Sequence, residues 1–235
     1  MILIFDLFET LIDDISLDFN RGLKTFWERH YRERCSFEEI KTYGEELFVH
    51  MQEQHKKGLE FAFVKDELPY YAEKFGGEVI PMDAKTEAEF LMRCNEVKVP
   101  DGLPNMLDVF RRARIPMYVI SNSGFTAGAL RIMLDLNGIA EFFEEIWSSA
   151  DFGRVKPSPE LFGMVLRELS ERHPEVALDD ILYIGDTYRT DIVGAHTAGL
   201  RTVWINRNSE ADELGYATYQ IREVTQLAAL LQSLE

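Results

Sequence analysis

The chain has 235 residues, of which 46% are hydrophobic and 28% charged, a globular composition that excludes disordered and fibrous classes. Its 25 Lys and Arg against 41 Asp and Glu give a formal net charge of −16. Binding to nucleic acid or to an anionic membrane surface depends on basic residues, so this balance argues against both partners. The length allows one large domain or two modest ones.

Two cysteines, Cys35 and Cys94, are too few for a disulfide framework, and they do not form a C-x-x-C pair. No apolar run approaches the ~20 residues that a membrane span needs. These features predict a soluble, cytoplasmic protein with reduced thiols. They leave its oligomeric state open between a monomer and a homodimer.

In chain order, residues 2–5 (ILIF) come first and form a short apolar run, which is typical of a strand buried on both faces. From Ser16 to Lys98 the sequence is polar, aromatic-rich and helical in pattern, with no clear strand. Within this stretch Ser36 and Glu39 form a capping box, which predicts that a helix begins there.

Apolar side chains recur at helical spacing near the start of this stretch, at Phe19, Leu23, Phe26 and Trp27. They predict a stripe that packs the helices together, with a lid over a substrate as the alternative. His50 and His55 are five residues apart rather than the four of a zinc-binding pair on one helix face, so we expect both to be solvated.

After residue 100 short apolar runs alternate with helical patterns. Strands are expected at 117–120, 145–147, 182–184 and 202–205, and helices near 104–113, 126–136, 159–171 and 189–198. This alternation predicts a doubly wound α/β fold, with a parallel sheet covered by helices on both faces. The simplest architecture is a core domain of residues 1–14 and 100–235 with an inserted all-helical cap domain, residues 15–99.

Polar residues follow three of the expected strands. Asp6, Ser121 and Asp186 each come directly after an apolar run. Ligands of open α/β sheets bind at the carboxyl ends of the strands, so the topology would gather these three side chains at one edge.

Ser121 and Asn122 open a Ser-Asn-Ser-Gly loop, whose hydroxyl and backbone N–H groups suit a phosphate oxygen, although an ordinary loop has the same composition. Lys156 precedes an expected helix with Ser158 as N-cap and Pro159 at its first position. A cation gains nothing from the dipole at a helix N-terminus, so a nearby anionic site would explain this lysine better than simple exposure.

Asp186 and Asp191 lie five residues apart between a buried strand and the next helix. Two acids in this position suit an oxygen-rich divalent cation site. A capped helix would explain Asp191 but not Asp186.

Together these elements resemble, in residue type, order and placement, the haloacid dehalogenase superfamily of hydrolases over the whole chain. The resemblance implies a Rossmann-like core, Mg²⁺ as cofactor, a small anionic substrate and an aspartyl-enzyme intermediate on Asp6. It implies that Ser121 and Asn122 bind the transferred group and that Lys156 offsets the charge of Asp6 and substrate. The metal ligands implied are Asp6, the backbone carbonyl of Phe8, Asp186 and Asp191, the last directly or through water.

The sequence departs from the phosphatase pattern at Phe8. Phosphatases of this superfamily have a second aspartate there, which protonates the leaving group and then activates water. A missing acid/base typically costs ~10²–10⁴ in rate. Glu9 and Asp13 are the nearby carboxylates that would have to replace it.

Three functions follow from this pattern. The first is a Mg²⁺-dependent hydrolase of a small phosphorylated metabolite through an aspartyl-phosphate on Asp6, slow because its acid/base is absent. The second is a 2-haloacid dehalogenase that forms an ester on Asp6, because dehalogenases also have an aromatic residue at the position of Phe8 and a halide needs no proton. The third is a catalytically weak binding protein of the same fold.

Overall fold

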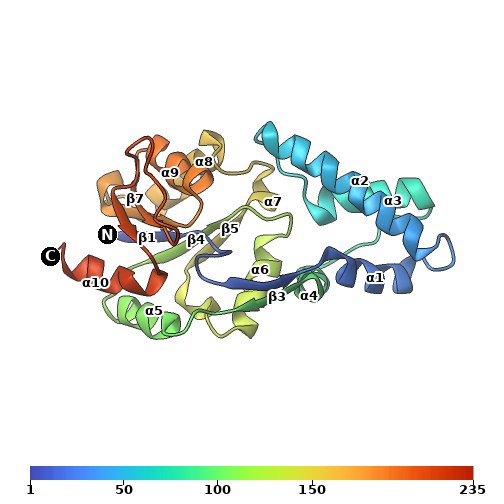
Figure 1. Ribbon diagram of the computed structural model, residues 1–235, viewed down its shortest axis with the longest axis horizontal. Coiled ribbons are helices and arrows are strands. Elements are labelled where there is room, and N and C mark those ends of the chain that lie inside the picture. Colours follow the sequence, from blue (N-terminus) through green and yellow to red (C-terminus); the bar gives the residue numbers. More distant parts are fainter. Residues whose placement is uncertain (235) are drawn as a thin grey trace.

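The computed structural model describes residues 1–234. A six-stranded parallel sheet forms its centre, in the spatial order β5-β4-β1-β6-β7-β8 (Figure 1). The strands are β1 (Ile2–Phe5), β4 (Met117–Ser121), β5 (Glu145–Ser148), β6 (Ile181–Gly185), β7 (Arg201–Ile205) and β8 (Tyr219–Ile221). The predicted doubly wound α/β fold is therefore confirmed; β8 is a strand that the sequence pattern did not indicate.

Helices cover both faces of this sheet, because side chains of β1 alternate between two hydrophobic cores. Leu3 and Phe5 belong to the core beneath α5, α6 and α10, whereas Ile2 and Ile4 belong to the core beneath α8 and α9. The bounds are α5 (Leu103–Arg112), α6 (Ala127–Leu136), α8 (Pro159–Arg172), α9 (Val193–Thr197) and α10 (Leu227–Gln232). A fully apolar strand is thus explained by burial on both sides.

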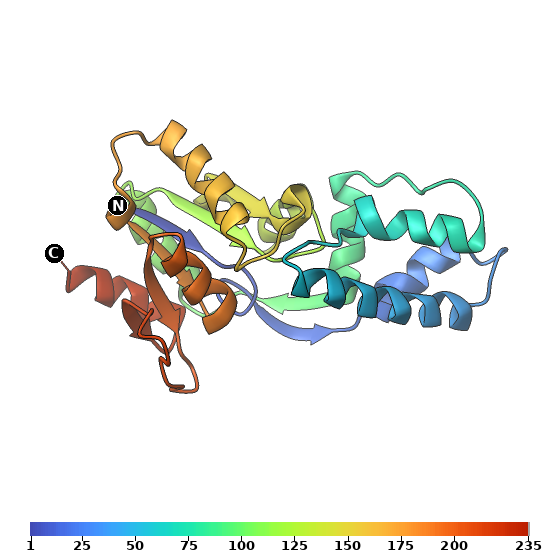
Figure 2. The ribbon, with the colours of Figure 1, turned by 90° about the horizontal axis from the view of Figure 1, so that it is seen from above.

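Residues 19–94 form a separate group of helices beside the sheet (Figure 2). They are α1 (Phe19–His30), α2 (Phe37–Lys56), α3 (Leu68–Phe75) and α4 (Ala84–Cys94). The capping box predicted at Ser36 and Glu39 is present at the start of α2. The apolar stripe is also confirmed as packing, since Leu23 and Phe26 are buried in a third, aromatic-rich core.

The expectation of an all-helical insertion is wrong at its two ends. β2 (Asp13–Leu17) pairs antiparallel with β3 (Asn95–Lys98), so both connections to the core run through one two-stranded ribbon. These strands carry mostly polar, exposed residues, so hydrophobic alternation did not reveal them. The boundaries predicted near residues 14 and 99 fall in or next to this ribbon and stay a prediction.

The helical group also packs directly on the core. Helix α4 lies against α6, and the ring of Phe125, from the core, contacts Phe63 and Phe90 of the helical group with centroid distances of 5.6 and 6.1 Å. Glu87 of α4 accepts hydrogen bonds from the backbone N–H and the hydroxyl of Thr126. These contacts attach the group on the β4 side of the sheet. Within residues 1–234 no helix is long and apolar enough to cross a membrane.

Candidate active site

Three carboxylates meet at the carboxyl edge of the sheet. Asp6 follows β1, where its backbone N–H donates to Ile184 of β6 over 2.8 Å. Asp186 follows β6, and Asp191 lies in a π-helical turn, Tyr188–Ile192. Oxygen atoms of Asp6, Asp186 and Asp191 all lie within 4.8 Å of one another. The predicted convergence of Asp6 and Asp186 follows from the adjacency of β1 and β6.

Lys156 inserts a single buried ammonium among these acids. Its Nζ lies 2.5 Å from Oδ1 of Asp6 and 2.7 Å from Oδ1 of Asp191. It also donates to the hydroxyl of Tyr183 over 2.9 Å and to the carbonyl of Ile120 over 3.1 Å. Helix α8 begins as predicted, with Ser158 as N-cap. Lys156 is therefore not an exposed surface residue but the cation of this site.

Asp191 is held from several directions. Its Oδ1 accepts from Lys156 and from the Tyr183 hydroxyl, at 2.7 and 3.0 Å, and its Oδ2 accepts from the backbone N–H of Thr187 at 3.0 Å. Asp186 contacts the hydroxyl of Thr187 at 3.2 Å. Within residues 1–234 the Asp191 carboxylate thus accepts from three protein donors, whereas the more exposed Asp186 carboxylate accepts from one.

Burial, together with the excess of acids over the single lysine, raises the pKa values of Asp6 and Asp186. Burial raises the pKa of Asp6 to about 7, with Asp191 and Asp186 adding to the rise, against the lowering effect of Lys156. Burial and then Asp191 raise the pKa of Asp186 to about 6. Burial lowers the pKa of Lys156, but Asp191 and Asp6 outweigh it and raise the pKa overall. A divalent cation bound by carboxylate oxygens would remove this excess of negative charge, and the donor set fits Mg²⁺.

Ser121 ends β4 beside Asp6, and its hydroxyl is buried without a hydrogen-bond partner within residues 1–234. A buried hydroxyl with no partner costs about 1–3 kcal/mol, so such groups usually have a ligand or water in the functional state. The predicted role of Ser121 in binding the transferred group fits this position.

Asn122 uses its side chain differently from the expectation. Its amide oxygen accepts from the backbone N–H of Lys156 at 2.7 Å, and its amide nitrogen donates to the Lys156 carbonyl at 3.1 Å. The side chain therefore fixes the loop that delivers Lys156. Binding of substrate by Asn122 stays a prediction. Because its side chain is engaged, only the backbone N–H of Asn122 would be available for this role.

Phe8 is half-buried and packs against the core of the sheet domain. Ligation of a metal by its carbonyl stays a prediction. Neither neighbouring acid points freely at the site, because Glu9 Oε1 accepts from the backbone N–H of Asp14 at 2.9 Å. Arg207 lies 3.5 Å from the other oxygen of Glu9 and 3.1 Å from Asp13. These contacts argue against Glu9 or Asp13 as the replacement acid.

Two groups of contacts were missed from the sequence. The Tyr183 hydroxyl bonds both Lys156 and Asp191; a lone tyrosine two residues before the end of an aliphatic strand was the available signal. Glu60 had no sequence signal, yet its carboxylate contacts His55 at 2.8 Å. The expectation that the histidines are solvated therefore holds only in part. Both side chains are half-buried, and the His50 ring meets that of Phe61 edge-on, with a centroid distance of 5.0 Å.

This fold and this set of carboxylates, lysine and serine define a class of hydrolases. The family model of haloacid dehalogenase-like hydrolases matches residues 3–205, and the chain belongs to this family.

The chain is 28% identical over 149 residues to pyrimidine 5′-nucleotidase YjjG of Escherichia coli, and the match covers 63% of each chain. It is 33% identical over 117 residues to the HAD-hydrolase YfnB of Bacillus subtilis, covering 49% of this chain and 47% of YfnB. The chain thus spans about half to two thirds of the length of these relatives.

A solved structure of 2-haloacid dehalogenase from Pseudomonas syringae has the same fold, with a TM-score of 0.68, 21% identity and full coverage of both chains. A structure of YfnB described as bound to magnesium and revealing interdomain movement has a TM-score of 0.58, 23% identity and 97% coverage of each chain. A nucleotidase is therefore among the relatives of this chain, and a 2-haloacid dehalogenase is among the solved structures that share its fold.

Proposed function

We propose that the protein is a Mg²⁺-dependent phosphatase of a small phosphorylated metabolite, working through an aspartyl-phosphate on Asp6. The observation that carries the proposal is the placement of Asp186 and Asp191 within 4.8 Å of Asp6 around a single lysine. Three carboxylates and one ammonium leave an excess of negative charge, which favours binding of a divalent cation. The bound cation would then attract the negatively charged phosphate of a substrate. The relative named as a nucleotidase and the magnesium-bound relative support the same choice.

Each side chain has a defined task in this reaction. An oxygen of Asp6 attacks phosphorus, the bond from phosphorus to the ester oxygen breaks, and the leaving group departs with the electron pair. Lys156 and the hydroxyl of Ser121 hold oxygens of the transferred group. Water then attacks the phosphorus of the aspartyl-phosphate, and the bond from phosphorus to the Asp6 oxygen breaks. Inorganic phosphate leaves, the proton of the water passes to phosphate or solvent, and the Asp6 carboxylate is restored. Bound Mg²⁺ would supply further positive charge for the phosphoryl oxygens.

A 2-haloacid dehalogenase is the second candidate, and Phe8 is the observation in its favour. Asp6 would displace halide from carbon and form an ester, a step that needs no general acid. Against this candidate, the carboxylate of the bound haloacid would lie in a site that holds three carboxylates and one lysine, where like charges repel it. Phe8 also keeps open the third possibility, a weakly catalytic protein that binds a phosphorylated ligand.

The deciding experiment is a panel of phosphomonoesters and 2-haloacids, each with Mg²⁺ and with EDTA. We expect release of phosphate with Mg²⁺ and none in EDTA. Release of halide in EDTA would select the dehalogenase, and no turnover of either class would select the binding protein.

Calorimetric titration tests the metal site independently of turnover. Replacing Asp186 removes a negatively charged oxygen ligand, so Asp186→Asn should weaken Mg²⁺ binding roughly 10-fold or more, since loss of an outer-shell partner alone costs a metal site about 10–100-fold. Asp180→Asn removes the same charge from an exposed position and should leave the affinity unchanged. Equal affinity of all three proteins would contradict the assignment.

A further inference from the structure

The segment from Gly58 to Phe63, between α2 and α3, lies against the core at the two loops that carry Ser121 and Lys156. The backbone N–H of Val155 donates to the Gly58 carbonyl at 3.1 Å, and that of Glu60 donates to the Gly153 carbonyl at 3.2 Å. Farther along, the N–H of Phe63 donates to the Gly124 carbonyl at 2.8 Å. We call residues 58–63 the strap. It touches both loops without supplying any of the predicted site residues.

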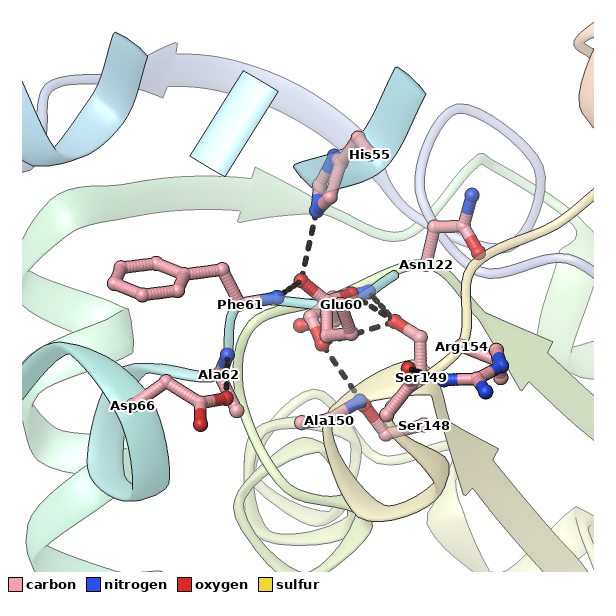
Figure 3. Close-up of polar contacts among 12 residues, drawn as sticks. His55, Glu60, Phe61, Ala62, Asp66, Asn122, Ser148, Ser149, Ala150 and Arg154 are labelled. Carbon is pink, nitrogen blue, oxygen red and sulfur yellow. Dashed lines mark hydrogen bonds and ion pairs between the residues drawn. The ribbon is translucent and has the colours of Figure 1, made fainter. Parts of the chain in front are cut away.

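Glu60 is the one acidic residue of the strap, and Figure 3 shows it between the helices and the core. Its side chain is 0% exposed. One carboxylate oxygen accepts from the backbone N–H of Phe61 at 2.9 Å and contacts Nε2 of His55 at 2.8 Å. The other accepts a hydrogen bond from the hydroxyl of Ser149, which belongs to the core. A buried carboxylate needs such partners, because an unpaired one costs several kcal/mol.

Ser149 links Glu60 to the loop that begins at Ser121. The oxygen of Ser149 that donates to Glu60 also accepts the backbone N–H of Ser123 at 2.8 Å. The neighbouring Ser148 donates to the carbonyl of Ser123 at 3.2 Å. Ser123 is therefore held by two hydrogen bonds at the end of β5. It lies two residues after Ser121 and directly after Asn122, the residue whose side chain fixes the Lys156 loop.

We propose that Glu60 is a positioning residue: through Ser149 and Ser123 it holds the Ser121–Gly124 loop in the geometry that binds the transferred group. The carboxylate orients the Ser149 hydroxyl so that its oxygen lone pair faces the N–H of Ser123. If that orientation is lost, the backbone of the loop moves and the Ser121 hydroxyl moves with it. The helical group would thereby control the shape of the site without touching substrate through this residue.

Glu87 provides a matched control on the same interface. It too is a buried carboxylate of the helical group that accepts hydrogen bonds from the core, but its partner is Thr126, the N-cap of α6. A Glu→Gln change at either position removes one charge and keeps the volume. The two variants differ in their partners. Glu60 is connected through Ser149 to Ser123 of the Ser121–Gly124 loop, whereas Glu87 is bonded to Thr126, outside that loop.

The kinetic arm, which rests on the proposed phosphatase function, uses p-nitrophenyl phosphate and Mg²⁺. Displacement of a binding group by ~1 Å can cost up to 10²-fold, so we expect Glu60→Gln and Ser149→Ala each to lower kcat roughly 10-fold, more than they raise KM. The double variant should be no slower than the slower single variant, because both changes break one chain of contacts. Glu87→Gln should keep kcat within about twofold at a similar cost in melting temperature.

The second arm needs no turnover and measures amide hydrogen exchange in the peptide that contains Ser123. We expect exchange there to rise roughly 10-fold in Glu60→Gln and Ser149→Ala and to stay unchanged in Glu87→Gln, because an amide exchanges faster when the hydrogen bond that protects it is weakened. Ser149→Ala, the smaller change, decides the outcome if Glu60→Gln does not fold.

Unchanged exchange at Ser123 would overturn the proposal whatever the substrate. The proposal would also be overturned if the losses of kcat in the two single variants multiplied in the double variant. An equal loss of kcat in Glu87→Gln would overturn it as well. Faster exchange in a protein that hydrolyses no phosphate ester would support the positioning role and reject the phosphatase.

Discussion

At the scale of single residues, Phe8 has the largest effect on the chemistry, because it stands where phosphatases of this family have their general acid. Its neighbours Glu9 and Asp13 are held by the loop backbone and Arg207. In the proposed phosphatase, the proton for a poor leaving group would therefore have to come from solvent. We expect the wild-type enzyme to prefer phosphate esters whose leaving groups depart unaided.

Phe8→Asp should restore proton transfer. The gain should be largest for alkyl phosphates, whose alkoxide leaving groups need a proton, and could approach ~10²-fold, the low end of what a positioned acid supplies. Aryl phosphates should gain little. The measurement is the ratio of turnover on alkyl and aryl phosphates in both proteins.

Glu9→Gln serves as the companion variant and should leave the wild-type activity nearly unchanged. Loss of activity in that variant would identify Glu9 as the acid. A folded Phe8→Asp protein that binds Mg²⁺ without a preferential gain on alkyl esters would show that Phe8 is not a missing acid.

Glu67 gives a prediction about pH and stability. Burial raises the pKa of Glu67 to about 7, and a hydrogen bond from Tyr71 opposes the rise. The folded protein therefore binds a proton that the unfolded chain releases at lower pH. The stability linked to this proton is fully present below pH ~4.5 and is lost as pH rises through about 7.

Glu67→Gln should accordingly have a free energy of unfolding that falls less between pH 5 and pH 8 than that of the wild type. The difference should be about 1–3 kcal/mol, at 1.36 kcal/mol for each pKa unit. Urea unfolding at several pH values measures it, and parallel pH profiles of the two proteins would contradict it. Other acids titrate in this range too, so only the difference between the proteins is informative.

The residues that could be predicted are those whose position follows from one strand and the turn after it. Asp6, Ser121 and Asp186 lie at strand ends, so the topology brings them to one edge without knowledge of any contact. Tyr183 and Glu60 were missed because their roles depend on partners 27 and 89 residues away, Lys156 and Ser149. Their local sequence carries no trace of those partners.

At the scale of elements, the end of β6 is shaped by close packing on Asp191. A Cβ atom on Gly185 would lie 2.6 Å from Cβ and Cγ of Asp191, closer than such atoms ever approach. The strand therefore needs glycine where the π-helical turn brings this carboxylate back over it.

Gly185→Ala should displace Asp191 from Lys156 and Tyr183. We expect a loss of stability of about 1–3 kcal/mol, typical of overpacking in a core. Turnover should also fall roughly 10-fold or more, because the lysine loses its orientation. A Cβ at Gly163, in α8, would meet no heavy atom of residues 1–234 within 4 Å apart from its chain neighbours and its own helix backbone. Gly163→Ala is therefore the control that should fold and react normally.

Element types were predictable where burial is strong. The parallel strands and the start of α2 follow from apolar runs and a capping box, both of which are local. The ribbon of β2 and β3 was missed because two short polar strands become stable only by pairing across all the helices that lie between them in the chain. A single sequence pattern does not encode such a pairing.

At the scale of the whole molecule, the helical group is joined to the core by the ribbon and docked on it by α4, Phe125, Glu60 and Glu87. The active-site residues lie at the edge of the sheet on the side of this group. We expect the group to rotate about the ribbon, which admits substrate and water and then excludes solvent.

Small-angle scattering tests this motion. Phe125→Ala removes an aromatic ring from the interface and should weaken docking by about 1–3 kcal/mol, less than the loss for a fully buried Phe. The radius of gyration of the free variant should then exceed that of the wild type, and Mg²⁺ with inorganic phosphate should reduce the difference. Identical scattering of both proteins with and without ligand would count against movement.

The β2–β3 ribbon also makes the insertion modular. Asp14 and Val97 are paired across it, so the chain leaves the core and returns to it at neighbouring positions, ~5 Å apart as in any antiparallel pair. A two-residue hairpin such as Asn-Gly could therefore close the ribbon after deletion of the intervening helices and leave every strand of the sheet in place. The same attachment would let helical inserts be exchanged as cassettes between relatives, so that substrate range could change while Asp6, Lys156 and Asp186 stay where they are.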